Sequence, residues 1–188
     1  MNRVSQSGKA GLRSAACVIF SAFALLLLGC GDRSETTVAD GARPPEVQYG
    51  SKINFGKGGN SEPYKKSGWS PTEEKFTWSE GTSARLEIPV PASNEPVTLK
   101  MRIAALIKPP DLPFQPVEAF INDQKIADWQ VAETSEFAAR VSPEVTKQGG
   151  VLKIEIKTPK ATSPKTLGLS ADPRVLGVCV LELQFAKE

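Results

Sequence analysis

The chain has 188 residues, of which 23 are Lys or Arg, 21 are Asp or Glu and none is His. This near balance leaves no strong basic field to hold nucleic acid or anionic lipid, and on that ground we exclude nucleic acid as a partner. The absence of histidine removes the commonest general base and metal ligand. With three cysteines in the chain, we also expect no structural zinc site and no other cofactor.

The first 29 residues have the pattern of a secretory signal. Arg3, Lys9 and Arg13 precede an apolar run from Ala15 to Leu28, and no acidic residue occurs before Asp32. A basic start, about fourteen apolar residues and a small residue before the cleavage site are typical of such signals. The run is shorter than the roughly 20 residues that a spanning helix needs. We therefore predict a signal peptide over residues 1–29.

The end of this segment, Leu27-Leu28-Gly29-Cys30, resembles the lipobox of bacterial lipoproteins. The resemblance implies a diacylglyceryl thioether on Cys30, cleavage before it and acylation of the new amino terminus, typically by palmitate. Two or three acyl chains bind a membrane far more durably than one. Gly31 stands where Asp would favour inner-membrane retention, so we expect a periplasm-facing protein anchored preferentially in the outer membrane. The alternative is an ordinary signal peptide in which Cys30 is incidental.

Cleavage changes the charge and leaves one cysteine in the domain. Loss of three basic residues leaves 20 against 21 acidic ones, a net charge near −1. Cys179 then has no partner for an internal disulfide. It lies among the apolar residues Val178, Val180 and Leu181, which predicts a small buried side chain with no reactive role.

Residues 30–50 are predicted to be a flexible tether. They are poor in large apolar residues and rich in Asp, Arg, Thr, Gly and Pro, so they bury too little surface to offset the entropy of ordering. At polyproline extension this segment spans up to about 60 Å. The remaining residues, 51–188, are predicted to form one domain.

Alternating polar and apolar residues predict strands along that domain. Residues 98–103 alternate, and residues 152–157 alternate with Leu152, Ile154 and Ile156 inward. Near the C-terminus, Cys179, Leu181, Leu183 and Phe185 are expected to share one face.

The other elements are bounded by turn residues. Residues 84–90 and 137–141 are predicted strands, and residues 117–121 and 126–131 form a predicted hairpin around Asn122-Asp123. Ser142 is expected to cap a short helical turn that Pro143 begins. About eight short strands predict an all-β fold, an antiparallel β-sandwich of jelly-roll type.

Two further segments carry ordered motifs, and together they resemble an uncharacterised jelly-roll-like domain that is often appended to membrane glycosyltransferases and envelope polysaccharide proteins. The matching residues are Gly56, Gly58, Gly59, Gly68, Trp69, Ser70, Glu73, Trp78, Ser163, Pro164, Gly168, Asp172, Arg174, Leu176 and Gly177. The chain departs from that pattern at Asp123 and Ser79, where Gly and Thr are usual. The resemblance implies a fold and an envelope-glycan context, and no established activity.

Aromatic residues in and near these segments are candidate sugar platforms. Trp69 is the first candidate, with Trp129 and Tyr64 as further candidates and Trp78 expected in the core. A flat ring stacks on the apolar face of a pyranose, and Glu73 and Arg174 are candidates for hydrogen bonds to its hydroxyl groups. Each has a structural alternative: Trp69 in the core, and a Glu73–Arg174 ion pair that holds a loop.

Asp172 and the Gly-rich residues 56–59 also have structural interpretations. Asp172 precedes Pro173, which favours a turn. Residues 56–59 fit a turn-rich segment in which glycine allows positive φ or a close backbone approach.

Catalysis has little support in the sequence. Glu73, Glu74 and Asp172 supply carboxylates, but any chain with 21 acidic residues does so. No nucleophile elbow or metalloprotease motif is present. We therefore expect a lipid-anchored envelope protein that recognises glycan without catalysis. The alternative is a module that docks a membrane-embedded protein.

Overall fold

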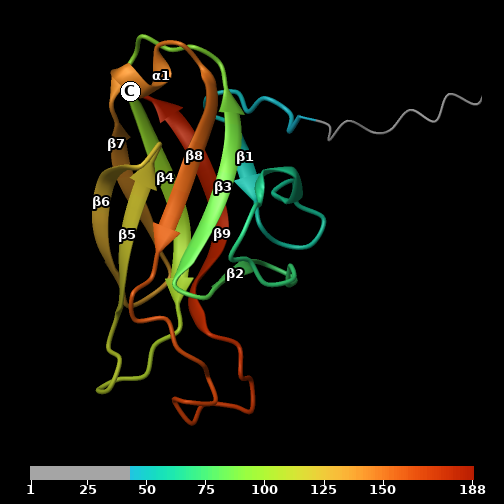
Figure 1. Ribbon diagram of the computed structural model, residues 1–188, viewed down its shortest axis with the longest axis vertical. Coiled ribbons are helices and arrows are strands. Elements are labelled where there is room, and N and C mark those ends of the chain that lie inside the picture. The colour runs from blue at the N-terminus through green and yellow to red at the C-terminus, as the bar shows by residue number, and fades with distance from the viewer. Residues whose placement is uncertain (1–42) are drawn as a thin grey trace, which may run out of the picture. The chain divides into compact units, whose positions relative to one another are not determined.

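Two antiparallel sheets make up the sandwich (Figure 1). The computed structural model describes residues 43–188, so the predicted signal, Cys30 and most of the predicted tether lie outside the described residues. The strands in the described part are β1 (Lys52–Asn54), β2 (Thr77–Glu80), β3 (Ser83–Val90), β4 (Val97–Ala105), β5 (Gln115–Ile121), β6 (Gln124–Val131), β7 (Ser135–Val141), β8 (Gly150–Lys157) and β9 (Leu176–Lys187).

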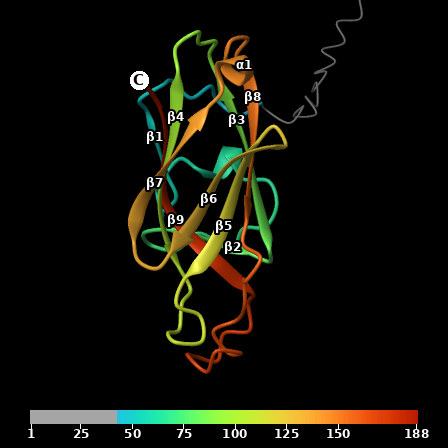
Figure 2. The ribbon, with the colours of Figure 1, turned by 90° about the vertical axis from the view of Figure 1, so that its left-hand side faces the viewer.

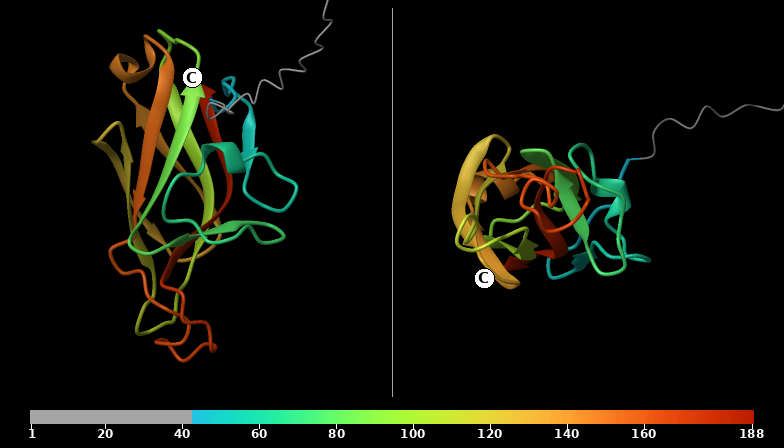
Figure 3. Two further views of the ribbon diagram at one scale, coloured as in Figure 1. Left: turned by 45° about the vertical axis from the view of Figure 1, so that its right-hand side comes forward. Right: turned by 90° about the horizontal axis from the view of Figure 1, so that it is seen from below.

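The strand order defines the two layers. One sheet runs β1-β9-β4-β7, with β2 also paired to β9, and the other runs β3-β8-β5-β6. The layers face each other when the molecule is turned (Figures 2 and 3). The prediction of an all-β antiparallel sandwich is confirmed, and the described residues contain nine strands where about eight were expected.

The core lies between the inward faces of the sheets. Leu99, Met101 and Ile103 of β4 are fully buried, and Leu152 and Ile154 of β8 are nearly so. The alternation predicted for these two strands is therefore confirmed, because every second side chain points into the same layer.

The predicted turn and cap are also present. Asn122 and Asp123 have φ of 48° and 65°, the conformation of a two-residue type I′ turn between β5 and β6. Asp123 occupies this left-handed conformation where Gly is usual. The short helix α1 (Pro143–Thr146) begins at Pro143, and the Glu144 N–H donates to Ser142 Oγ.

The only other helical element in the described residues is the 3₁₀ turn η1 (Glu62–Tyr64). Neither it nor α1 has the length and apolarity needed to cross a membrane.

The prediction for one face of β9 was wrong. Ile103 lies opposite Val180, whereas Arg102 lies opposite Glu182, so Leu181 is an extra residue in the ladder. Such a bulge inverts the alternation. Val178 and Val180 therefore belong to the same core as Leu183 and Phe185. Cys179 is buried as expected, but on the opposite face of the strand.

The contacts of the sandwich begin before the predicted boundary at residue 51. Val47 is buried, and its N–H donates to Pro89 O over 2.8 Å. The Tyr49 hydroxyl donates to Pro91 O, and the Gly50 N–H donates to Phe185 O. Residues 47–50 thus belong to the folded unit rather than to a free tether.

Candidate functional site

The Gly68-Trp69-Ser70 motif joins the edges of the two sheets. On one side, the Ser70 N–H donates to Trp78 O of β2 over 3.0 Å. On the other side, the Arg85 N–H of β3 donates to Ser67 O over 2.9 Å. Because β2 and β3 belong to different sheets, this segment closes one open side of the sandwich.

Trp69 covers the core at that closure. Its ring lies 5.5 Å from the fully buried ring of Phe55, and its indole N–H donates to Arg85 O over 2.8 Å. Gly68 makes this approach possible, since a Cβ there would lie 2.0 Å from Ser83 O. These contacts favour the core role of Trp69 over the sugar platform.

Trp129 and Tyr64 are almost wholly buried. Trp129 is 8% exposed and packs its ring 5.6 Å from Phe137, which closes the opposite side of the sandwich between β6 and β7. Tyr64 is 4% exposed in the core. The burial of both rings corrects their selection as stacking platforms, because stacking requires an exposed face.

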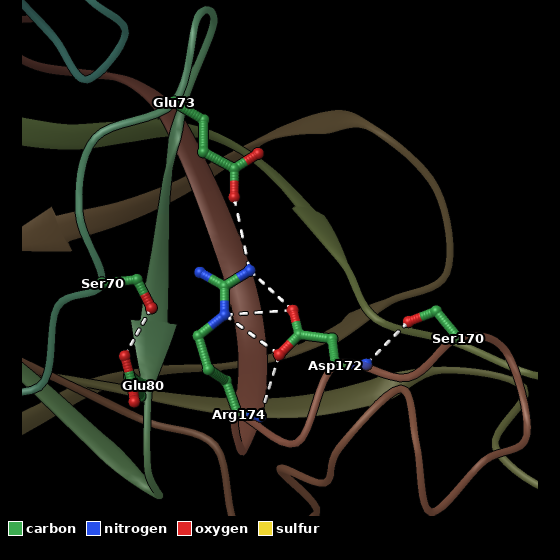
Figure 4. Close-up of polar contacts among 6 residues, drawn as sticks. All are labelled: Ser70, Glu73, Glu80, Ser170, Asp172 and Arg174. Carbon is green, nitrogen blue, oxygen red and sulfur yellow. Dashed lines mark hydrogen bonds and ion pairs between the residues drawn. The ribbon is translucent and has the colours of Figure 1, made fainter.

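Glu73 and Arg174 form an ion pair, which was the structural alternative to a glycan contact (Figure 4). Arg174 Nη2 lies 3.7 Å from Glu73 Oε1 and 2.6 Å from Asp172 Oδ2. The Arg174 backbone N–H also donates to Asp172 Oδ1 over 2.9 Å, which forms the turn expected around Pro173. The loop before β9 is thereby joined to the loop before β2.

The charges of this group are mutually stabilised. The hydrogen bonds from Arg174 hold the pKa of the Asp172 carboxyl below its usual value. The same contacts raise the pKa of the Arg174 guanidinium, with smaller contributions from Glu73 and Glu80. Glu80 in turn accepts a hydrogen bond of 2.6 Å from the Ser70 hydroxyl (Figure 4). Both predicted motifs therefore contribute to one polar cluster.

Phe76 and Trp78 form an aromatic pair on the outer face that sequence reasoning missed. Thr77 and Ser79 are fully buried, so the alternating neighbours Phe76 and Trp78 point away from the core. Their rings meet edge to face, 5.7 Å apart. The expectation that Trp78 lies in the core was wrong, since it is half-buried and lies outside the core cluster.

An open hollow lies beside this pair, which we call the β2 hollow. Its volume is about 580 Å³, and it is lined by Lys57, Thr72, Glu73, Glu74, Lys75 and Phe76. Lys57 Nζ lies 3.1 Å from Glu74 Oε1. The hollow thus combines one aromatic ring with carboxylate acceptors and ammonium donors, the mixture that ligand sites use.

The Gly-rich segment forms one wall of the β2 hollow. The Lys57 N–H donates to Glu73 O over 2.9 Å. A Cβ at Gly56 would lie 2.8 Å from Glu74 O. Gly58 has a φ of 75°. The close backbone approach and the positive φ expected of these glycines are both present.

Comparisons with known proteins give the fold alone. No family model matches the chain, and no curated protein matches it. A carbohydrate-binding module, CBM36, solved with calcium and xylotriose, is similar at 11% identity and a TM-score of 0.42, covering 72% of this chain and 99% of that one. A family 6 carbohydrate-binding module is similar at 10% identity and a TM-score of 0.44, covering 77% and 99%.

A third similar structure is the CBM22-1 xylan-binding domain of Xyn10C from Paenibacillus barcinonensis. It has 11% identity and a TM-score of 0.46, with coverage of 75% of this chain and 97% of that chain. At such identities and scores these likenesses carry no argument about a ligand.

A second hollow, of about 390 Å³, lies over β3 and β8. Two ion pairs lie in its lining, Arg85 with Glu155 at 3.1 Å and Lys66 with Glu87 at 3.5 Å, and Asp123 and Lys153 line it as well. A hydrogen bond from the Ser83 hydroxyl, with Arg85 nearby, lowers the pKa of Glu155. No aromatic side chain lines this hollow, so it fits a sugar less well than the β2 hollow. In the part of the chain that the structure describes, no cluster of three or more His, Cys, Asp or Glu is placed to hold a metal ion.

Proposed function

We propose that this chain is a lipid-anchored protein of the bacterial envelope whose sandwich binds glycan without catalysing a reaction. The observation that carries the binding proposal is the β2 hollow, where Phe76, backed by Trp78, lies beside carboxylate and ammonium groups. An aromatic ring supplies a flat apolar surface, and the polar rim supplies donors and acceptors for hydroxyl groups.

Each lining group has a distinct part in this proposal. The Phe76 ring stacks on the C–H face of a sugar ring. Glu73 and Glu74 accept hydrogen bonds from hydroxyl groups, and Lys57 and Lys75 donate to hydroxyl oxygens. Arg174 is a positioning residue, because its ion pair with Glu73 fixes that carboxylate at the rim.

The state of the nearby carboxylates supports binding over hydrolysis. A glycosidase needs a carboxylic acid whose pKa is raised so that it can protonate the leaving group. Arg174 instead lowers the pKa of Asp172, and the same guanidinium contacts Glu73. The Asp172 carboxyl is therefore favoured in the charged form, which does not suit a general acid.

The anchor part of the proposal rests on residues 25–30, which lie outside the described residues. We propose that Cys30 carries lipid and that the protein faces the periplasm, with the outer membrane favoured by Gly31. Cells producing the whole chain and fed an alkyne-bearing palmitate analogue should label it. Cys30→Ser should abolish labelling, whereas labelling that persists would contradict the anchor.

The binding proposal is tested on residues 41–188, the compact unit that contains every strand and the whole described core. Binding to purified envelope saccharides is measured by calorimetry after an array screen. Phe76→Ala should weaken binding about tenfold or more, because burying a Phe ring contributes about 1.5 kcal/mol or more.

Phe120→Ala is the matched control. Phe120 is also half-buried and points outward, but from the other sheet, where Lys157 Nζ lies 4.5 Å from its ring centroid. Its replacement should leave binding unchanged. No binding to any envelope saccharide, with a membrane protein recovered from extracts instead, would overturn glycan recognition in favour of docking.

A further inference from the structure

Two long loops project from the same end of the sandwich, which we call the loop end. One connects β4 to β5 over residues 106–114, and the other connects β8 to β9 over residues 158–175 (Figures 1 and 2). Lys160 Nζ of the second loop lies 5.7 Å from the Phe114 ring centroid of the first. The two loops therefore touch and form one surface.

The tip of the second loop is held by its own hydrogen bonds. The Leu169 N–H donates to Pro164 O over 2.8 Å, and the Lys165 N–H donates to Asp172 O over 2.9 Å. Gly168, just before Leu169, has a φ of 69°. The loop thus presents Leu169 in a formed turn, so little ordering entropy remains to oppose a contact made there.

The tip of the second loop exposes a large apolar side chain. Leu169 is 50% exposed, the highest value among the large hydrophobic side chains of the described residues. Other exposed residues of the two loops are also small or apolar: Pro109, Pro110, Pro113, Ala171 and Pro173. Single exposed leucines are common, but this one belongs to a pair of loops that expose several further apolar residues.

Two exposed lysines accompany the apolar tip. Lys160 and Lys165 make no ion pair with any residue that the structure describes, whereas Lys108 pairs with Asp111 at 3.2 Å. Arg174 is satisfied by Asp172 and Glu73. The loop that carries Leu169 therefore also carries two exposed ammonium groups without a carboxylate partner among the described residues, each on a long flexible stem.

We propose that the loop end contacts an anionic lipid surface, with Leu169 inserted at headgroup level and Lys160 and Lys165 beside lipid phosphates. The whole chain carries no strong basic field, but an exposed apolar group with lysines on the same loop is the combination that interfacial binding uses, since burial and charge attraction add. Charge complementarity selects anionic lipid over a neutral bilayer. This contact lies apart from the β2 hollow and does not depend on glycan binding.

The test is sedimentation of residues 41–188 with vesicles of phosphatidylcholine alone, or of phosphatidylcholine with phosphatidylglycerol. Omitting Cys30 removes any acyl chain from the measurement. The unmodified protein should bind the anionic vesicles and lose binding as salt rises. The paired change Lys160→Ala and Lys165→Ala should weaken this binding about thirtyfold.

Leu169→Ser should weaken vesicle binding about tenfold. Val151→Ser is its matched control, because Val151 is also an exposed aliphatic residue, at 37%, but lies at the start of β8 near α1, the other end of the sandwich (Figure 1). Absence of binding to anionic vesicles, equal binding to both vesicle types, or equal loss in the Val151 control would overturn the proposal. Capture of a protein partner by the loop end without vesicle binding would do so as well.

Discussion

The Arg174 guanidinium lies 3.7 Å from the Glu73 carboxylate and joins two loops that are about a hundred positions apart in the chain. Neither loop belongs to the regular ladder of the sheets, so this ion pair is a tertiary link between them, while the Asp172–Arg174 contact orders the loop before β9. The rim of the β2 hollow, to which Glu73 belongs, is therefore linked to the loop before β9.

Asp172→Asn should lower the melting temperature at neutral pH, and the difference from the unmodified protein should vanish in acid. The hydrogen bonds from Arg174 hold the pKa of Asp172 in the folded state below its ordinary value. A lowered folded pKa stabilises the fold above the unfolded pKa, and that stability is lost as pH falls through the folded pKa. The stabilisation by ionised Asp172 should therefore be lost below about pH 4.

Melting curves followed by circular dichroism from pH 7 down to about pH 2 would measure this difference. Asp123→Asn provides a control carboxylate that makes no ion pair with any described residue. A difference for Asp172→Asn that stays constant through the acid range would show that the ion pair does not stabilise the folded protein.

Trp69→Ala should destabilise the domain far more than Trp78→Ala. Trp69 packs on Phe55, and its indole N–H donates to Arg85 O. Its removal therefore exposes one side of the core. We expect a loss of about 3 kcal/mol in the free energy of unfolding, against about 1 kcal/mol for Trp78, which lies outside the core cluster. Urea denaturation measures both, and similar losses would contradict these two roles.

Gly68→Ala should cost more stability than Gly58→Ala. Both residues have a φ of 75°, so both substitutions carry the same left-handed strain of about 1 to 2 kcal/mol. At Gly58 nothing lies within 4 Å of the added Cβ, whereas at Gly68 the backbone oxygen of Ser83 lies 2.0 Å away. The difference between the two urea midpoints isolates this steric term, and equal midpoints would argue against it.

Local patterns predicted much of the fold. The alternation of residues 98–103 and 152–157, the Asn122-Asp123 turn and the Ser142 cap each depend on neighbours in sequence, and each is present. The bulge at Leu181 is different, because it is set by how β9 pairs with β4. One extra residue in a strand moves every side chain beyond it to the opposite face of the sheet.

The candidate site was less predictable for a related reason. Trp69 and Trp129 are covered by Phe55 and Phe137, residues from other elements, and spacing along the chain does not reveal such pairs. The alternation in Phe76-Thr77-Trp78-Ser79 shows that the two aromatic residues share one face of a strand, but hydrophobicity alone would place that face inward. The observed burial of Thr77 and Ser79 instead goes with the pairing of β2 to β9.

Cys179 should serve as a reporter of unfolding. It is the one cysteine in residues 41–188, and burial raises its pKa to about 11. At pH 8 only about one folded molecule in a thousand would carry the reactive thiolate. We therefore expect a thiol reagent to label the native protein slowly and the urea-unfolded protein at once. Mass spectrometry after timed labelling gives both rates, and rapid labelling of native protein would mean that β9 opens locally around Cys179.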